Sequence, residues 1–154
     1  MKVVYTIGHS NRTLEEFLSL LAKYSIKTLV DVRRFPSSRK YPHFNKGSLA
    51  EELKKLGIKY VWLGELLGGF RKGGYEKYME TEDYRRGIER LVRLMEEASP
   101  IAVMCKERLW FKCHRRFIAD TLVRLGYTVV HIIDEKREYR HKSRRQHEGT
   151  TAAN

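Results

Sequence analysis

The sequence predicts an α/β protein with an open, mostly parallel sheet of about five strands and helices on both faces. Short apolar runs rich in β-branched residues alternate along the chain with amphipathic segments of helical period. Glycine, proline and polar residues separate these segments. The length of 154 residues suits one domain, so we expect residues 1–134 to form a single α/β domain and residues 135–154 a basic C-terminal tail.

The first expected unit is a strand, a turn, a helix and a second strand. Residues 3–7 form a β-rich apolar run, which a glycine turn over residues 8–12 separates from an amphipathic segment. Thr13 and Glu16 have the spacing of a capping box, which predicts that a helix begins directly after Thr13. Residues 28–32 form the next strand, so the opening predicts a βαβ unit with a right-handed crossover.

The rest of the chain continues this alternation around two loops. Residues 33–47 mix prolines and serines with aromatic and basic side chains, and a loop of this length is typical of a substrate cover. A second basic loop, residues 67–74, contains two glycine pairs. The remaining elements are expected as helices over residues 49–56, 83–98 and 113–125, and as strands over residues 60–63, 101–104 and 129–133.

The composition favours an anionic partner and excludes a membrane protein. The net charge is +12, and residues 1–134 keep 25 basic and 16 acidic side chains, so the body of the protein is itself basic. Such an excess favours phosphates, nucleotides or nucleic acid, although it also suits a solvated cationic surface. No segment approaches the roughly 18 apolar residues of a membrane span, and the N-terminus has no signal-peptide pattern, so a cytoplasmic protein is expected. Aromatic side chains near basic residues are candidates to stack on bases, with packing in the core or at its rim as the alternative: Tyr41, His43, Phe44, Phe70, Trp110 and Phe111.

Polar residues follow three of the expected strands at the point where each strand ends. Residues 8–10, Gly-His-Ser, follow the first strand; Asp31 and Arg33 end the second; Cys105 and Glu107 follow the strand over residues 101–104. Ligands of open α/β sheets bind beyond the carboxyl ends of the strands, so we expect these residues to share one edge. The alternative interpretations are a plain tight turn, a structural ion pair and a small buried cysteine.

The two cysteines, Cys105 and Cys113, indicate free thiols, a redox pair or metal ligands rather than the disulfide framework of a secreted protein. Cys113 is expected at a helix start beside His114 and Arg115. These surroundings depress the pKa of a thiol and favour an anion at the same helix end.

A zinc site is the metal alternative for this region. Cys105, Cys113 and His114, with His9 or Asp31, would supply four ligands. The seven-residue gap between the cysteines is not a standard zinc spacing, so we expect neither a metal nor another cofactor.

The combined motifs identify the chain as resembling a prokaryotic family, domain-of-unknown-function family 488. The resemblance covers most of residues 4–133 and implies an α/β fold with an active site lined by the matching segments, but no particular reaction. The matching residues are Thr6-Ile7-Gly8-His9-Ser10, Leu29-Val30-Asp31-Val32-Arg33 with Pro36 and Ser38, Phe44-Asn45, Gly57-Ile58-Lys59-Tyr60, Leu67-Gly68-Gly69, Cys105 with Glu107, and Cys113-His114-Arg115.

The leading functional hypothesis is an enzyme that acts on an anionic substrate, a nucleotide or a nucleic-acid-derived compound, through a cysteine nucleophile or redox thiol. The alternatives are a non-catalytic nucleic-acid-binding module and a small-molecule sensor or structural partner. The expected catalytic residues are Cys113, Cys105, Glu107 and His9, and the expected substrate-binding residues are Gly8, Ser10, Asp31, Arg33, His114 and Arg115. Within this set, Asp31 is expected to orient Arg33 for anion binding.

Overall fold

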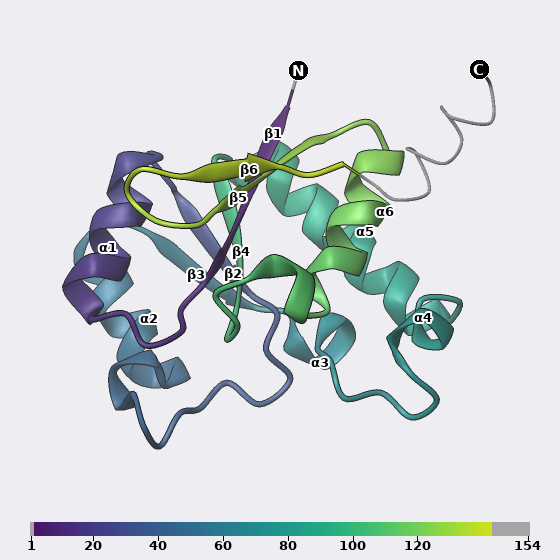
Figure 1. Ribbon diagram of the computed structural model, residues 1–154, viewed down its shortest axis with the longest axis horizontal. Coiled ribbons are helices and arrows are strands. Elements are labelled where there is room, and N and C mark those ends of the chain that lie inside the picture. The colour runs from purple at the N-terminus through teal and green to yellow at the C-terminus, as the bar shows by residue number, and fades with distance from the viewer. Residues whose placement is uncertain (1, 143–154) are drawn as a thin grey trace.

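The computed structural model describes residues 2–142 and has an α/β fold built on one open sheet (Figure 1). Over this range the sheet contains six strands in the order β3-β2-β4-β1-β5-β6, all parallel except β6, which is antiparallel to β5. The strands are β1 (Val3–Gly8), β2 (Thr28–Asp31), β3 (Lys59–Trp62), β4 (Ile101–Cys105), β5 (Thr128–Ile132) and β6 (Glu138–Arg140). The mostly parallel α/β sheet is confirmed, with one strand more than expected.

The additional strand, β6, lies in the segment that we assigned to the tail. Residues 138–140 carry exposed side chains with no apolar pattern, so only their pairing with β5 makes them a strand. The next residue, His141, is buried. Residues 138–141 therefore belong to the sheet, whereas residues 143–154, with the expected basic residues Arg144 and Arg145, lie outside the described part of the chain.

The helices cover both faces of the sheet, as expected. Figure 1 shows α1 (Leu14–Lys23) and α2 (Lys46–Lys55) on one side of the strands, and α5 (Glu82–Ala98) and α6 (Arg115–Arg124) on the other. Each pair packs on its own cluster of buried apolar side chains. Two short helices, α3 (Gly64–Leu67) and α4 (Tyr75–Tyr78), lie in the connection between β3 and α5.

The starts of α1 and α6 test two predictions from the sequence. The capping box is confirmed, because the Thr13 hydroxyl accepts from the backbone N–H of Glu16, whose side chain accepts from the N–H of Thr13. The helix expected from Cys113 instead begins at Arg115. The backbone of Cys113 is extended and connects a 3₁₀ helix, Trp110–Lys112, to α6. The sulfur of Cys113 accepts a hydrogen bond from the backbone N–H of Arg115.

The strand register brings the ends of three strands to one edge, as expected. Gly8 of β1 pairs with Cys105 of β4, and Asp31 of β2 pairs with Met104 of the same strand. The segments that follow these residues therefore leave the sheet side by side. Within residues 2–142, no helix is long and apolar enough to cross a bilayer.

Candidate active site

The turn after β1 and the loop after β4 extend the pairing of their strands. The backbone N–H of His9 donates to the carbonyl of Cys105 at 2.9 Å, and that of Ser10 donates to Lys106 at 2.8 Å. A β-carbon on Gly8 would lie 1.7 Å from the carbonyl oxygen of Glu107. Gly8 is thus required for close backbone approach, and it holds the Glu107 loop against the sheet edge.

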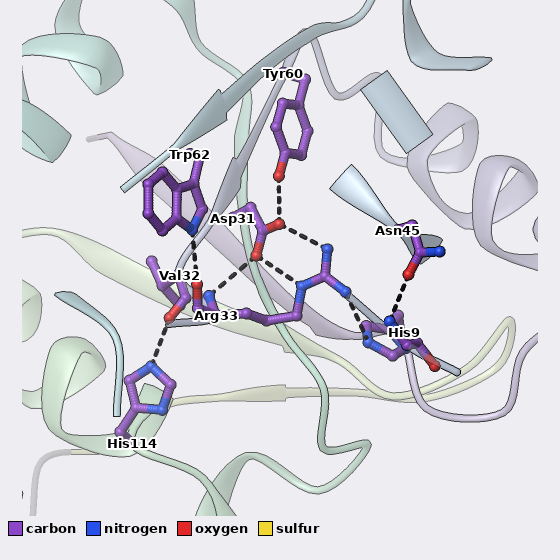
Figure 2. Close-up of polar contacts among 9 residues, drawn as sticks. His9, Asp31, Val32, Arg33, Asn45, Tyr60, Trp62 and His114 are labelled. Atoms are coloured by element: carbon purple, nitrogen blue, oxygen red, sulfur yellow. Dashed lines mark hydrogen bonds and ion pairs between the residues drawn. The ribbon is translucent and has the colours of Figure 1, made fainter. Parts of the chain in front are cut away.

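Asp31 and Arg33 form a buried ion pair that Figure 2 shows at the centre of a polar network. The guanidinium donates Nε–H to Oδ1 of Asp31 at 2.9 Å and Nη2–H to Oδ2 at 2.7 Å. The Tyr60 hydroxyl donates to Oδ2, and the Trp62 indole donates to the carbonyl of Arg33 at 2.7 Å. Burial opposes the charge on Arg33, but its bonds to Asp31 prevail and raise its pKa. Asp31 therefore fixes the orientation of the Arg33 guanidinium, while the expected role of Arg33 in anion binding stays a prediction.

His9 connects this ion pair to the core on the α1 side. Its Nδ1 lies 3.0 Å from the carbonyl of Ser10, and its Nε2 lies 3.3 Å from Nη1 of Arg33. A carbonyl only accepts and a guanidinium only donates, so His9 is neutral with its proton on Nδ1. Burial, partly offset by the Ser10 carbonyl and reinforced by the charge of Arg33, lowers the pKa of His9 to about 4. The ring also stacks on Phe44. Since Arg33 occupies its lone pair, His9 is better suited to positioning Arg33 than to abstracting a proton.

The sulfur of Cys113 lies at this edge of the sheet, close to a second sulfur and to an imidazole. Sγ lies 2.6 Å from Sγ of Cys105 and 3.5 Å from Nδ1 of His114. The hydrogen bond from Cys105 lowers the pKa of Cys113, and the neighbouring His114 and Arg115 lower it further against the opposing effect of burial. Burial raises the pKa of the Cys105 thiol, which Cys113 raises further. The pKa values of the two thiols are therefore shifted in opposite directions, and Cys113 is the sulfur that ionises first.

His114 is held in the orientation that a base for Cys113 requires. Its Nε2–H donates to the carbonyl of Val32 at 3.0 Å, a contact drawn in Figure 2. The other ring nitrogen, Nδ1, faces the sulfur of Cys113. Tyr75 packs against the ring, and Gly69 leaves space beside Nδ1. The carbonyl of Val32, the residue after β2, thus fixes the orientation of the His114 ring.

Arg115 lies below this site and is 1% exposed. Its guanidinium donates to the carbonyls of Glu107 and Arg108 and to the Thr6 hydroxyl at 2.9 Å. In the part of the chain that the structure describes, its Nε has no hydrogen-bond partner and no carboxylate forms an ion pair with it. Arg115 is too deeply buried for the expected direct contact with a substrate, and it instead fixes the Glu107 loop and adds positive potential near Cys113.

A buried chain of hydrogen bonds, which the sequence analysis did not predict, supports Arg115. Thr6 and His131 face each other across β1 and β5, and Oγ1 of Thr6 lies 2.5 Å from Nδ1 of His131. His131 is 2.8 Å from His141 of the β6 end, whose Nε2 lies 2.6 Å from Oδ1 of Asp120. The Thr6 hydroxyl accepts from Arg115 at one end of this chain, and the Asp120 carboxylate accepts from His141 at the other. The polar His131 within an otherwise apolar strand was the available sequence signal.

A cavity of about 510 Å³ opens above Cys113. Six of the expected site residues line this cavity: His9, Arg33, Cys105, Glu107, Cys113 and His114. The other expected substrate-binding residues do not line it, because Gly8, Asp31 and Arg115 are buried beneath the site and Ser10 turns toward Asn11.

The rest of the cavity wall combines phenylalanines with basic side chains. Phe35 and Phe70 lie 5.9 Å apart by ring centroids and are 64% and 83% exposed. Phe111 of the 3₁₀ helix and Phe117 of α6 also line the cavity. The basic members are Arg34, Lys106, Lys112 and Arg116.

The aromatic residues expected to stack on bases lie in different parts of the structure. Phe70 and Phe111 line the cavity, whereas Phe44 is buried in the core, and Tyr41, His43 and Trp110 lie elsewhere. Phe35 and Phe117 were missed, because a lone phenylalanine in a loop or on a helix carries no local signal for a cavity.

Comparison with known proteins shows the family to which this chain belongs. The model of the family described as "Domain of unknown function DUF488" matches residues 13–122. The chain belongs to this family. No curated protein and no solved structure matches it. The DUF488 match includes Cys105, Cys113 and His114, whereas His9 and the chain from Thr6 through His131 to His141 include residues beyond its limits.

The zinc alternative requires at least three ligands around one point in this DUF488 protein. Over residues 2–142, no group of three or more histidine, cysteine or acidic side chains is arranged to hold a metal ion. His114 uses Nε2 to bond the carbonyl of Val32, and Asp31 is engaged by Arg33 and Tyr60. The arrangement instead places the Cys113 sulfur, the oriented His114 ring and Glu107 at one cavity.

Proposed function

We propose that this DUF488 protein is an enzyme that uses Cys113 as a nucleophile on a small anionic substrate with an aromatic ring, of the nucleotide class. The single observation that carries the proposal is the position of the Cys113 sulfur. It lies 2.6 Å from the buried Cys105 sulfur and 3.5 Å from an imidazole that Val32 orients, at the wall of a 510 Å³ cavity. A thiolate next to an oriented base is the signature of covalent catalysis.

The composition of the cavity wall supports the substrate class. Arg34, Lys106, Lys112 and Arg116 supply positive charge for a phosphate or carboxylate. The exposed rings of Phe35 and Phe70 supply faces on which a base can stack. A volume within the roughly 300–1,000 Å³ typical of ligand pockets suits a mononucleotide better than a polymer.

The proposed reaction proceeds in two steps. In the first step the Cys113 thiolate, whose proton rests on Nδ1 of His114, attacks an electrophilic carbon or phosphorus of the substrate, and the leaving group takes that proton from Nδ1 as it departs. Water then attacks the covalent intermediate and gives its proton to the Glu107 carboxylate, and Sγ leaves as the thiolate. The cations of the cavity wall bind the anionic part of the substrate in both steps.

A binding experiment tests the substrate class. Calorimetry at low salt compares adenosine monophosphate with adenosine, which lacks the phosphate, and with ribose 5-phosphate, which lacks the ring. We expect the nucleotide to bind more tightly than either fragment, and Phe70→Ala to weaken it about tenfold, since a stacked base contributes roughly 1–3 kcal/mol. Leu56→Ala is the matched control, because Leu56 is exposed outside the cavity.

A second experiment separates the enzyme from the nucleic-acid-binding alternative. Cys113→Ser should abolish turnover in a panel of nucleotide esters and thioesters while leaving nucleotide binding unchanged. A binding module predicts instead that Lys54→Ala on α2, outside the cavity, weakens binding of single-stranded RNA as much as Lys112→Ala does. Equal effects of these two lysines, together with the absence of any turnover, would replace the enzyme proposal.

A further inference from the structure

The two cysteines form a pair of unequal accessibility. Their sulfurs lie 2.6 Å apart, and both are free thiols. Cys105 ends the central strand β4 and is 1% exposed, whereas Cys113 is partly exposed at the cavity wall. The two residues come from separate elements that the sheet edge and α6 hold together, so no rearrangement of the chain is needed for their sulfurs to meet.

We propose that this pair reduces small hydroperoxides, with Cys113 as the attacking thiolate and Cys105 as the resolving thiol. The proposal needs only the sulfur pair and stands independently of the nucleotide-class substrate. The peroxide reaction gives Cys105 a chemical role. In the nucleophilic reaction, Cys105 serves only as a hydrogen-bond donor.

The chemistry balances in two steps. Cys113 thiolate attacks the terminal oxygen of the hydroperoxide and breaks the O–O bond, which yields a sulfenic acid on Cys113 and releases an alcohol, or water from hydrogen peroxide, once the leaving oxygen takes up a proton. Cys105 then attacks the Cys113 sulfur, a disulfide forms, and the hydroxyl group leaves as water with the Cys105 proton. The sulfur pair loses two electrons and the peroxide gains them. A small dithiol or protein thiol restores the pair by exchange.

The surroundings of the two sulfurs support Cys113 as the attacking thiolate and Cys105 as the resolving thiol. Cys113 accepts the backbone N–H of Arg115 and lies beside His114, contacts that stabilise a thiolate. Cys105 is enclosed by the core, and its sulfur lies 3.6 Å from the carbonyl oxygen of Glu107. A peroxide in the cavity therefore reaches Cys113 first, and Cys105 becomes oxidised only through its partner. The disulfide would remove the nucleophile, so oxidation would also reversibly switch off the proposed hydrolytic activity.

Peptide mapping after controlled oxidation tests the pair. The fully reduced protein is treated with one equivalent of hydrogen peroxide at pH 7, alkylated and digested with trypsin without reduction. Cleavage after Arg93, Lys106, Lys112 and Arg115 places the cysteines on separate peptides, residues 94–106 and 113–115. We expect these peptides to be joined and the protein to run as a monomer on a non-reducing gel.

Two variants assign the roles within the pair. In Cys105→Ser, the sulfenic acid on Cys113 has no resolving partner and should be trapped by dimedone, with a yield at least tenfold above that of the wild type. In Cys113→Ser, Cys105 should remain reduced under the same conditions. Circular dichroism checks that both variants are folded. Wild-type protein in which Cys105 stays free after peroxide treatment, a disulfide-linked dimer, or oxidation of Cys105 in Cys113→Ser would each overturn the proposal. Loss of peroxide chemistry with nucleotide turnover intact would refute this inference alone.

Discussion

The carbonyl oxygen of Glu107 lies directly over Gly8. It is 1.7 Å from the point that a β-carbon on Gly8 would occupy. This approach is possible because β1 and β4 are parallel neighbours and their pairing continues past the strand ends through His9 and Ser10. The loop that carries Glu107 is also held by Arg115. The walls of the active-site cavity therefore depend on a glycine that does not line it.

Gly8→Ala should destabilise the protein strongly, because the new methyl group meets backbone atoms that cannot yield cheaply. We expect a loss of about 3 kcal/mol or more in the free energy of unfolding, measured by urea denaturation. Gly47→Ala is the matched control: Gly47 lies in α2 with no atom within 4 Å of the added carbon, so this change should be neutral or stabilise by up to about 1 kcal/mol. Similar effects of both substitutions would contradict the close approach.

Cys113 should react with iodoacetamide faster than Cys105 at pH 7, because its pKa is lowered and it reaches the cavity. The rate should persist well below pH 8.5, near which an ordinary thiol titrates, and should fall only as acid protonates the thiolate. His114→Ala removes one of the groups that lower the pKa, so it should slow the reaction at pH 6 more than at pH 9. Mass spectrometry of the two peptides follows each rate. Equal, slow labelling of both cysteines in the folded protein would show that neither is activated.

Asp31→Asn should destabilise the protein by about 3–5 kcal/mol, since it leaves the buried Arg33 without its counter-ion. Glu52→Gln breaks an exposed ion pair with Lys55 and should cost less than about 1 kcal/mol. Thermal or urea unfolding compares the two at pH 7. A loss for Asp31→Asn no larger than that of the surface control would mean that solvent reaches the Arg33 guanidinium.

The neutral His9 predicts a loss of stability in mild acid. Its pKa is near 6.5 in the unfolded chain and about 4 in the folded protein. Between these values the unfolded state binds a proton that the folded state does not, so stability falls as the pH falls, by up to about 1.4 kcal/mol per pH unit. His131, whose pKa is also lowered, acts with the same sign.

The pH effect is measured as the urea midpoint between pH 6.5 and 5, where most carboxylates remain ionised. Proton NMR of the folded protein separately follows the His9 ring, which should show no protonation until the pH approaches 4. Titration of this ring near pH 6.5 would contradict the bond that Arg33 donates to its Nε2.

Local sequence patterns predicted both the family of this chain and its alternation of strands and helices, and both predictions are confirmed. Apolar runs such as residues 101–104 indicate buried parallel strands, and Thr13 with Glu16 marks the start of α1, because both signals act over a few residues. Parallel strands then bring their carboxyl ends to one edge, so the neighbourhood of Gly8, Asp31 and Cys105 follows from topology alone.

The tertiary structure decided which of these residues share the cavity. Arg115 was expected to bind an anion, but α6 begins at this residue and its side chain points beneath the site. Phe35 and Phe70 meet only because two irregular loops fold over one another, and loop conformations depend on contacts between distant residues.

By itself, the sequence determined the periodicity of the elements, the identity of the reactive groups and the strand ends at which they stand. Antiparallel pairing with β5 made Glu138–Arg140 a sixth strand, and packing between distant segments aligned Thr6, His131 and His141 below Arg115. Residues 138–140 have no apolar period, and a buried histidine chain needs complementary donors and acceptors from different elements. The sixth strand has no apolar signal of its own, and the histidine chain depends on the contact between Thr6 and His131, which are 125 residues apart in the sequence.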